Sequence, residues 1–169
     1  TLFKEPFKTI KREKNIYKKL PKYLSLNEAK KVLKVYEDKE NFIGLRNNAI
    51  LHLFLCSGLR LSELADLKIT DFNLKEKKFI VIGKGRKERT CYFNEKTKKV
   101  LEKYIDYRKS NPVEDKKVNS YLFLSQHKLK LSKRQIERIV KRAYIEAGLD
   151  ENNYNVHSLR HSFATILYK

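Results

Sequence analysis

The feature that most constrains the fold is an apolar run, AILHLFLC, at residues 49–56. A helix that is apolar on nearly every side is stable only when other elements cover it completely. We therefore predict that a helix at residues 46–57 lies in the middle of one hydrophobic core, where His52 is a hydrogen-bonded core residue and not a ligand. Gly58 follows and suits a helix C-terminus, where a left-handed residue is favoured. A length of 169 residues is sufficient for one such domain.

The rest of the chain predicts a mainly helical α+β domain. Capping boxes at residues 25–28 and 132–135 mark two helix starts. Apolar residues at helical spacing predict helices, in addition to the central one, at residues 25–38, 61–67, 94–108, 132–148 and from 157 onward.

A small antiparallel sheet is predicted where the apolar period shifts to two. Its strands are expected at residues 72–74, 79–82 and 90–93, with turns at 75–78 and 83–87. Residues 109–120 are expected to form a polar loop, and residues 121–124 a short extended segment.

The charge of the chain indicates a polyanionic partner. Lysine and arginine number 39 against 20 aspartate and glutamate residues, which gives a formal charge of +19. Such an excess favours nucleic acid first and an anionic membrane surface second. No apolar run approaches the roughly 20 residues that span a bilayer, so we expect no membrane association. Cys56 and Cys91 are expected to be buried free thiols in a reducing cytoplasm.

Two cations stand next to glycines in the sequence. Arg60 comes just after Gly58, where a guanidinium is rigidly placed and can bind a phosphate through two nitrogens. Lys84 lies between two glycines, which allow a tight turn and a close approach to a ligand. Each residue alone also fits an ordinary role, as a surface arginine in a loop or as a solvated lysine in a hairpin turn.

A third candidate lies near the C-terminus, where His157 and Arg160 share a helix face. One can transfer a proton while the other holds charge. His157 and His161 have the spacing of a zinc pair, but no glutamate occupies the H-E-x-x-H position and no third ligand is evident. We therefore predict no metal and no cofactor, and we expect His161 to pack.

The helix predicted after residue 132 carries a dense basic face. Its cations are Lys133, Arg134, Arg138, Lys141 and Arg142. The density exceeds that of most solvated faces, so we predict contact with a DNA backbone, although a solvated face remains the alternative. Arg86 and Lys87, in the predicted turn beside Lys84, are further DNA-binding candidates.

Three sequence blocks in a fixed order are typical of one family. They are SGLRLSEL at 57–64, IGKGRKER at 82–89 and HSLRHSFAT at 157–165. With these blocks the chain resembles the catalytic domain of the tyrosine recombinases, the phage integrase and Xer family. The resemblance implies a catalytic domain at residues 21–169 with a small three-stranded sheet, preceded at residues 1–20 by a basic interdomain linker or arm. It also implies site-specific recombination in which DNA is cut and rejoined through a 3′-phosphotyrosine.

The resemblance implies roles for six matching residues. Arg60 and Arg160 would clamp the scissile phosphate, Lys84 would protonate the leaving 5′ oxygen, His157 would act as general acid and base, Glu63 would support the site, and His161 would be largely structural. Two fixed guanidiniums can stabilise charge on the non-bridging oxygens without a metal, which is consistent with these roles.

The sequence departs from the family at its end. The nucleophilic tyrosine of the family comes well after the H-x-x-R block, whereas the sequence ends nine residues past Arg160. Tyr168 falls in the same predicted helix as Arg160, and Tyr144 and Tyr154 precede the block, so none of them matches the nucleophile. We therefore expect a catalytic domain that lacks its C-terminal nucleophile segment, and a fragment that binds DNA without cleaving it.

The implied partners are double-stranded DNA at specific recombination sites and further copies of the protein, assembled as a tetramer on DNA. Accessory DNA-bending proteins are a further class of partner. The main rival is a non-catalytic, sequence-specific DNA-binding protein that keeps the recombinase scaffold. A type IB topoisomerase and a general polyanion-binding domain are weaker rivals, and the last leaves Arg60, Lys84, His157 and Arg160 unexplained.

Overall fold

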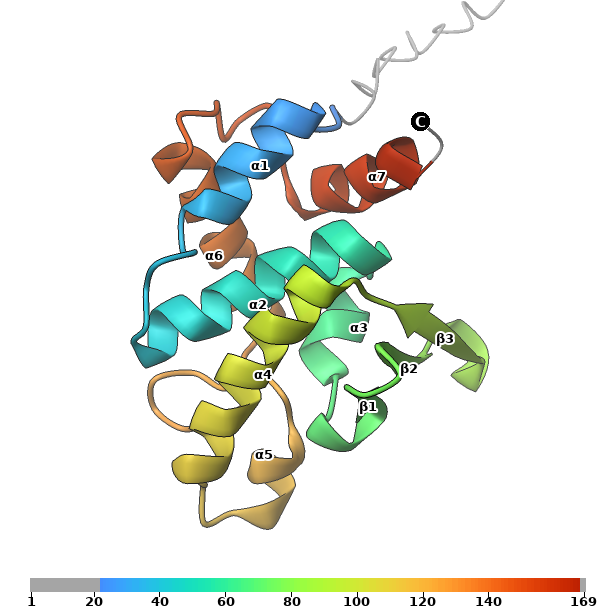
Figure 1. The fold of residues 1–169 in the computed structure, drawn as a ribbon, viewed down its shortest axis with the longest axis vertical. Coiled ribbons are helices and arrows are strands. Elements are labelled where there is room, and N and C mark those ends of the chain that lie inside the picture. The colour runs from blue at the N-terminus through green and yellow to red at the C-terminus, as the bar shows by residue number, and fades with distance from the viewer. Residues whose placement is uncertain (1–21, 168–169) are drawn as a thin grey trace, which may run out of the picture.

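A computed structural model describes residues 22–167. The basic arm predicted at residues 1–20 and Tyr168 lie outside these described residues. The helices are α1 (Leu26–Lys34), α2 (Phe42–Ser57), α3 (Leu61–Asp66), α4 (Glu95–Ser110), α5 (Lys116–Ser120), α6 (Lys133–Glu146) and α7 (Val156–Leu167). Helix α2 runs through the middle of the molecule, with α4 crossing it and with α1 and α7 on another side (Figure 1).

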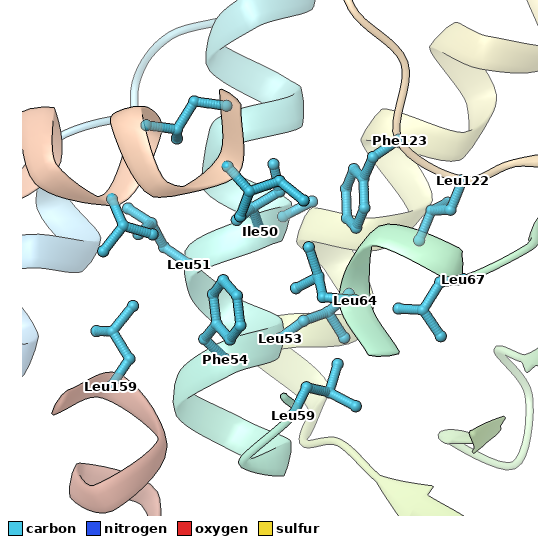
Figure 2. Packing of buried hydrophobic residues seen from close by; sticks show 14 of the residues in the cluster. Ile50, Leu51, Leu53, Phe54, Leu59, Leu64, Leu67, Leu122, Phe123 and Leu159 are labelled. Carbon is cyan, nitrogen blue, oxygen red and sulfur yellow. The ribbon is translucent and has the colours of Figure 1, made fainter. Parts of the chain in front are cut away.

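Helix α2 is the centre of the core, as its apolar run predicts. Ile50, Leu51, Leu53 and Phe54 have no exposed surface. Figure 2 shows Leu159 of α7 pointing toward this helix from one side, while residues of α3 and of the segment before α6 pack on the other. The helix begins at Phe42, and its N-cap is Asn41, whose side chain accepts a hydrogen bond from the Gly44 amide. It therefore starts four residues earlier than predicted.

The three-stranded sheet lies near the C-terminal end of α2 (Figure 1). Its strands are β1 (Phe72–Asn73), β2 (Lys78–Ile82) and β3 (Glu88–Tyr92), in antiparallel order β1-β2-β3. Phe79 of β2 faces the core and stacks on Phe72, with 4.8 Å between ring centroids. The prediction of a small antiparallel sheet is confirmed, with β3 beginning two residues before the predicted strand.

The predicted polar loop at residues 109–120 is wrong in part, because it contains α5. Asp115 caps this helix by accepting hydrogen bonds from the amides of Lys117 and Val118. Arg108 of α4 then donates to the carbonyl oxygens of Asn119, Tyr121 and Leu122. A short helix that is held by a cap and one arginine needs no apolar period, which is why the pattern did not reveal it.

The other boundaries follow the predicted caps. Ser25 and Ser132 form complete capping boxes at the starts of α1 and α6, and the Asn94 side chain caps α4. Helix α1 ends at Lys34 and continues as turns, which is four residues earlier than predicted.

His52 is a core residue, as predicted. It is 4 % exposed, and its Nδ1 lies 3.3 Å from Oγ1 of Thr97. Burial lowers the pKa of His52 to about 4, because the imidazolium form loses its hydration. Cys56 and Cys91 are free thiols, but only Cys91 is fully buried. Among the described residues, no helix is both long enough and apolar enough to cross a membrane.

Candidate functional site

The corner where α2 ends is the point at which distant parts of the chain meet. Gly58 adopts a left-handed conformation with φ of 58°. A Cβ atom at this position would lie 2.4 Å from Cδ1 of Phe163, so the ring of α7 occupies the space that a larger residue would need. In addition, Nη1 of Arg160 donates a hydrogen bond of 2.7 Å to the Gly58 carbonyl oxygen. Helix α7 therefore docks on this corner, two residues from Arg60.

Glu63 is a buried carboxylate at the same corner, with 5 % of its surface exposed. Its Oε2 accepts a 2.7 Å hydrogen bond from the backbone amide of Arg60, and its Oε1 accepts one of 3.1 Å from Nη1 of Arg60. Arg89 of β3 binds both oxygens of Glu63, at 2.7 and 3.0 Å. One carboxylate thus fixes the arginine that precedes α3 and an arginine of the sheet.

The three arginines influence one another electrostatically. The pKa of Arg160 is lowered, first by partial burial and then by the nearby charges of Arg60 and Arg89, while Glu63 opposes the shift. Two guanidiniums therefore bind one carboxylate while a third, that of Arg160, lies close enough to feel their charges, and the corner retains an excess of positive charge. We refer to Arg60, Glu63, Arg89 and Arg160 as the arginine corner.

The arginine corner suits an oxyanion better than a metal ion. Guanidiniums bind phosphate oxygens through paired N–H donors and keep their charge at any physiological pH. Within residues 22–167, no group of three or more His, Cys, Asp or Glu side chains could hold a metal ion. The chemistry available here is binding of an anion and stabilisation of negative charge that develops on it.

The structure brings three of the six residues singled out by the sequence into the arginine corner: Arg60, Glu63 and Arg160. Lys84 is exposed in the turn between β2 and β3. The base of that turn lies at the corner, because a Cβ atom on Gly83 would be 3.7 Å from Oε1 of Glu63.

The two histidines of α7 both lie on its exposed side. His157 lines a cavity of about 270 Å³ between α3, α6 and α7, together with Leu61 and Lys141. It is therefore next to the start of α3, where Arg60 lies. The expectation that His161 packs is wrong, since the residue is exposed; the neighbouring Ser162 and Leu159 supply the buried face of the helix.

Arg89 is the residue that sequence reasoning missed. It fell between the predicted turn and the predicted strand, and β3 in fact includes it opposite Val81. A usable signal was present, because Arg89 and the buried Cys91 are two residues apart and therefore lie on the same face of the strand. A cation on the inner face of a strand requires a buried acid as its partner.

The basic face of α6 differs from the arginine corner. Arg134, Arg138 and Lys141 are all exposed, and none makes an ion pair with another described residue. Arg142 does form one, with Glu146 at 3.2 Å. Arg86 and Lys87 are likewise exposed in the turn after β2.

Comparison with known proteins gives a consistent result. The sequence model of the phage integrase family matches residues 22–169. The tyrosine recombinase XerC of Caldanaerobacter subterraneus subsp. tengcongensis is 40 % identical over 151 residues, which cover 88 % of this chain and 40 % of that protein. The tyrosine recombinase XerD of Listeria monocytogenes is 36 % identical over 148 residues, which cover 88 % of this chain and 49 % of that protein. The chain thus spans about half the length of the curated relatives it matches.

Solved structures show the same likeness. The crystal structure of XerA recombinase has a TM-score of 0.77 and 32 % identity, and the match covers 88 % of this chain and 51 % of that chain. The XerH site-specific recombinase, solved in a pre-cleavage complex with its difH substrate, has a TM-score of 0.74 and 31 % identity over 89 % of this chain and 44 % of that chain. The mainly helical fold with a small three-stranded sheet is that of these recombinases.

Proposed function

This chain belongs to the phage integrase family, and on that premise we propose that it is the catalytic part of a site-specific recombinase that cuts and rejoins DNA through a 3′-phosphotyrosine. The observation that carries the proposal is the arginine corner. Arg60, just before α3, is held by the buried carboxylate of Glu63, and Arg160 of α7 is held by the Gly58 carbonyl oxygen, so two arginines that are distant in sequence are fixed at one corner. The proposal assigns residues 21–169 to the catalytic domain and residues 1–20 to a basic interdomain arm.

The scissile phosphate would bind between Arg60 and Arg160. Attack on a phosphodiester places negative charge on the non-bridging oxygens, and fixed donors stabilise that charge without having to reorganise. Arg60 is held by Glu63 and Arg160 by the Gly58 carbonyl oxygen, so each guanidinium keeps further N–H groups for the phosphate.

In the proposed reaction, a tyrosine oxygen bonds to phosphorus while the bond from phosphorus to the 5′ oxygen breaks. His157 accepts the proton of the tyrosine hydroxyl, and Lys84 gives a proton to the leaving 5′ oxygen. The reverse attack by a 5′ hydroxyl rejoins the strand, and the covalent intermediate conserves the bond energy that this step needs. Glu63 and His161 are assigned supporting roles.

The attacking tyrosine is assigned to a segment other than residues 22–167. Tyr144 donates its hydroxyl to the Asn155 carbonyl oxygen, and burial raises its pKa. Tyr154 donates to Oε1 of Glu28, and its pKa is raised as well. A hydroxyl that is committed to an internal acceptor and resists ionisation is a poor nucleophile.

Double-stranded DNA is the proposed partner. The exposed cations Arg134, Arg138 and Lys141 of α6, with Arg86 and Lys87 of the turn, would bind phosphates on either side of the scissile position. XerH, which is similar to this chain, was solved on its DNA substrate. We further propose self-association to a tetramer on DNA, with accessory DNA-bending proteins as additional partners.

A nicked suicide substrate tests the proposal. The product of the whole gene is incubated with candidate target duplexes, taken from sequences beside the gene, that carry a nick next to the scissile phosphate. The nick lets the cleaved fragment diffuse away, so a covalent protein–DNA adduct accumulates and is seen on a denaturing gel. We expect an adduct with the wild type, and about 1000-fold slower adduct formation with Arg160→Ala.

The matched control is Lys103→Ala. It removes an exposed cation that pairs with Glu40 and that lies on α4, which contributes no residue to the arginine corner. It should leave the rate of adduct formation unchanged. Tight binding to a confirmed target with no adduct from the wild type would contradict the proposal. That outcome would favour a non-catalytic DNA-binding protein with the same scaffold.

A further inference from the structure

The side chain of Arg89 joins the β2–β3 hairpin to the rest of the arginine corner. Arg89 is the second residue of β3, and its guanidinium binds both oxygens of Glu63 at 2.7 and 3.0 Å. A bidentate pair of this kind fixes distance and angle together, unlike a contact through one nitrogen. Glu63 is buried on α3, so the hairpin is tied to a helix of the core and not to another surface element.

The ion pair between Arg89 and Glu63 lies close to the turn that carries Lys84. Glu88, the neighbour of Arg89, pairs with Ile82 at the last rung of the ladder. The turn is then closed by a 2.8 Å hydrogen bond from the Gly83 amide to the Lys87 carbonyl oxygen. Gly83 also approaches Glu63, since a Cβ atom there would lie 3.7 Å from Oε1. The position of the turn is therefore set at its base by Glu63.

Arg89 is bound to Glu63 through more of its side-chain nitrogens than Arg60 is. Nη1 and Nη2 both donate to Glu63, and its side chain is 38 % exposed against 57 % for Arg60. Arg60 uses one side-chain nitrogen for the same carboxylate and is the more exposed of the two. Because of this difference, Arg60 is better suited to bind the phosphate and Arg89 is better suited to hold the hairpin.

We propose that Arg89 is a positioning residue, which holds the β2–β3 hairpin against α3 so that Lys84 reaches the leaving 5′ oxygen. This inference rests on the proposed function. It assigns to Arg89 an effect on proton transfer and not on the charge of the phosphate. Loss of Arg89 should therefore resemble loss of Lys84 and differ from loss of Arg160.

A substrate with sulfur in place of the scissile 5′ oxygen separates these effects. In that substrate the phosphorus–sulfur bond breaks, and the thiolate leaves without a proton because it is a far weaker base than an alkoxide. A defect in delivering the proton disappears on the sulfur substrate. A defect in stabilising the phosphate charge remains.

The experiment measures single-turnover adduct formation by the product of the whole gene on both substrates. For Arg89→Gln we expect a loss of about 100-fold on the oxygen substrate and recovery to within about tenfold of wild type on the sulfur substrate. Lys84→Ala should show the same recovery, and Arg160→Ala should be slow on both substrates. Arg89→Lys keeps the charge without the fork, so it should show a smaller loss with the same recovery.

The control for the hairpin is Lys78→Gln, which removes a cation of β2 that pairs with Glu76 and does not touch Glu63. It should behave as wild type on both substrates. If Arg89→Gln does not fold, Arg89→Lys carries the same comparison, and all rates are measured below the unfolding transition of each variant.

Two results would overturn the inference while leaving the proposed function intact. One is wild-type activity of Arg89→Gln on the oxygen substrate, which would show that the hairpin does not need the ion pair between Arg89 and Glu63 to place Lys84. The other is an equal loss on both substrates, which would place Arg89 with the phosphate-binding arginines. Absence of any wild-type adduct overturns the proposed function, and the inference falls with it.

Discussion

The arginine corner and the basic face of α6 are both rich in cations, but they hold them differently. In the corner, Glu63 or the Gly58 carbonyl oxygen fixes each guanidinium. On α6, Arg134, Arg138 and Lys141 are exposed and make no ion pair with a described residue. Fixed charges can stabilise a transition state because they need not reorganise, whereas free charges contribute mainly long-range attraction to phosphates. This difference is the reason that we propose catalysis at the corner and affinity for DNA on the helix.

The largest predicted difference in stability concerns two glycines. One lies in the arginine corner and the other in the exposed turn between β2 and β3. Gly58 in the corner and Gly85 in the exposed turn both have positive φ, 58° and 75°. Gly58→Ala combines left-handed strain with a clash against Phe163, so we expect it to lower the free energy of unfolding by about 3 kcal/mol. Gly85→Ala meets no atom within 4 Å and should cost about 1 kcal/mol from strain alone.

Urea denaturation of the two variants measures this difference. Equal losses would show that α7 does not depend on the fit of Phe163 against Gly58, and would weaken the account of how Arg160 reaches the corner.

A second comparison sets the carboxylate of the corner against one on α6. Glu63→Gln removes the buried charge that two partly exposed arginines share, and should lower the free energy of unfolding by about 2 kcal/mol. Glu146→Gln removes exposed ion pairs with Lys39 and Arg142, and should change it by about 0.5 kcal/mol or less. Chemical denaturation at low and high salt provides the measurement. A loss at Glu63 that is as small and as salt-sensitive as the loss at Glu146 would contradict the view that the corner is pre-organised.

The buried and exposed regions should also differ in their response to pH. The folded-state pKa of His52 is about 4, below the value of about 6.5 in an unfolded chain. As the pH falls below 6.5, the unfolded chain binds a proton that the folded chain resists. The stability that neutral His52 provides is therefore complete above pH 6.5 and is lost as the pH approaches 4, by about 2.5 kcal/mol at pH 4.5.

The variant His52→Gln removes the titrating group from the core. Denaturation from pH 7.5 to 4.5 should show a flatter pH dependence for His52→Gln than for wild type. An unchanged slope in His52→Gln would show that His52 is not held neutral in the core.

The smallest effects are expected on α6. Each phosphate contact that is lost should reduce the slope of log affinity against log salt by about 0.9, so Arg138→Ala and Lys141→Ala together should reduce it by about 2. The affinity for DNA should fall while the cleavage rate of bound DNA stays the same. Titrations at several salt concentrations, with Lys103→Ala as the control, measure the slope. An unchanged slope would mean that the basic face of α6 is merely solvated.

The sequence was sufficient to predict the elements that depend on local chemistry. The apolar run of α2, the capping boxes at Ser25 and Ser132 and the left-handed Gly58 each act within a few residues, so their patterns are visible in one dimension. Helix α5 was missed because its stability comes from one cap and from Arg108, which no periodicity records.

For the site, the sequence indicated which residues matter but not how they are held. Family resemblance singled out Arg60, Glu63 and Arg160, and these residues meet in the structure. The alternation of β3 marks Arg89 as inward-facing, but its partner lies 26 positions away, and no local pattern identifies that partner. The burial of Glu63 could not be predicted either, because its position on the helix does not indicate that two arginines bind its carboxylate.

The most direct test of the central claim uses a suicide substrate whose scissile phosphate is replaced by an uncharged methylphosphonate. If Arg160 stabilises charge on the non-bridging oxygens, Arg160→Ala should form adduct about 1000-fold more slowly than wild type on the phosphate. It should form adduct at nearly the wild-type rate on the methylphosphonate, where that charge is absent. An equal loss on both substrates would mean that Arg160 serves only to dock α7 on Gly58, and would contradict the assignment of catalysis to the arginine corner.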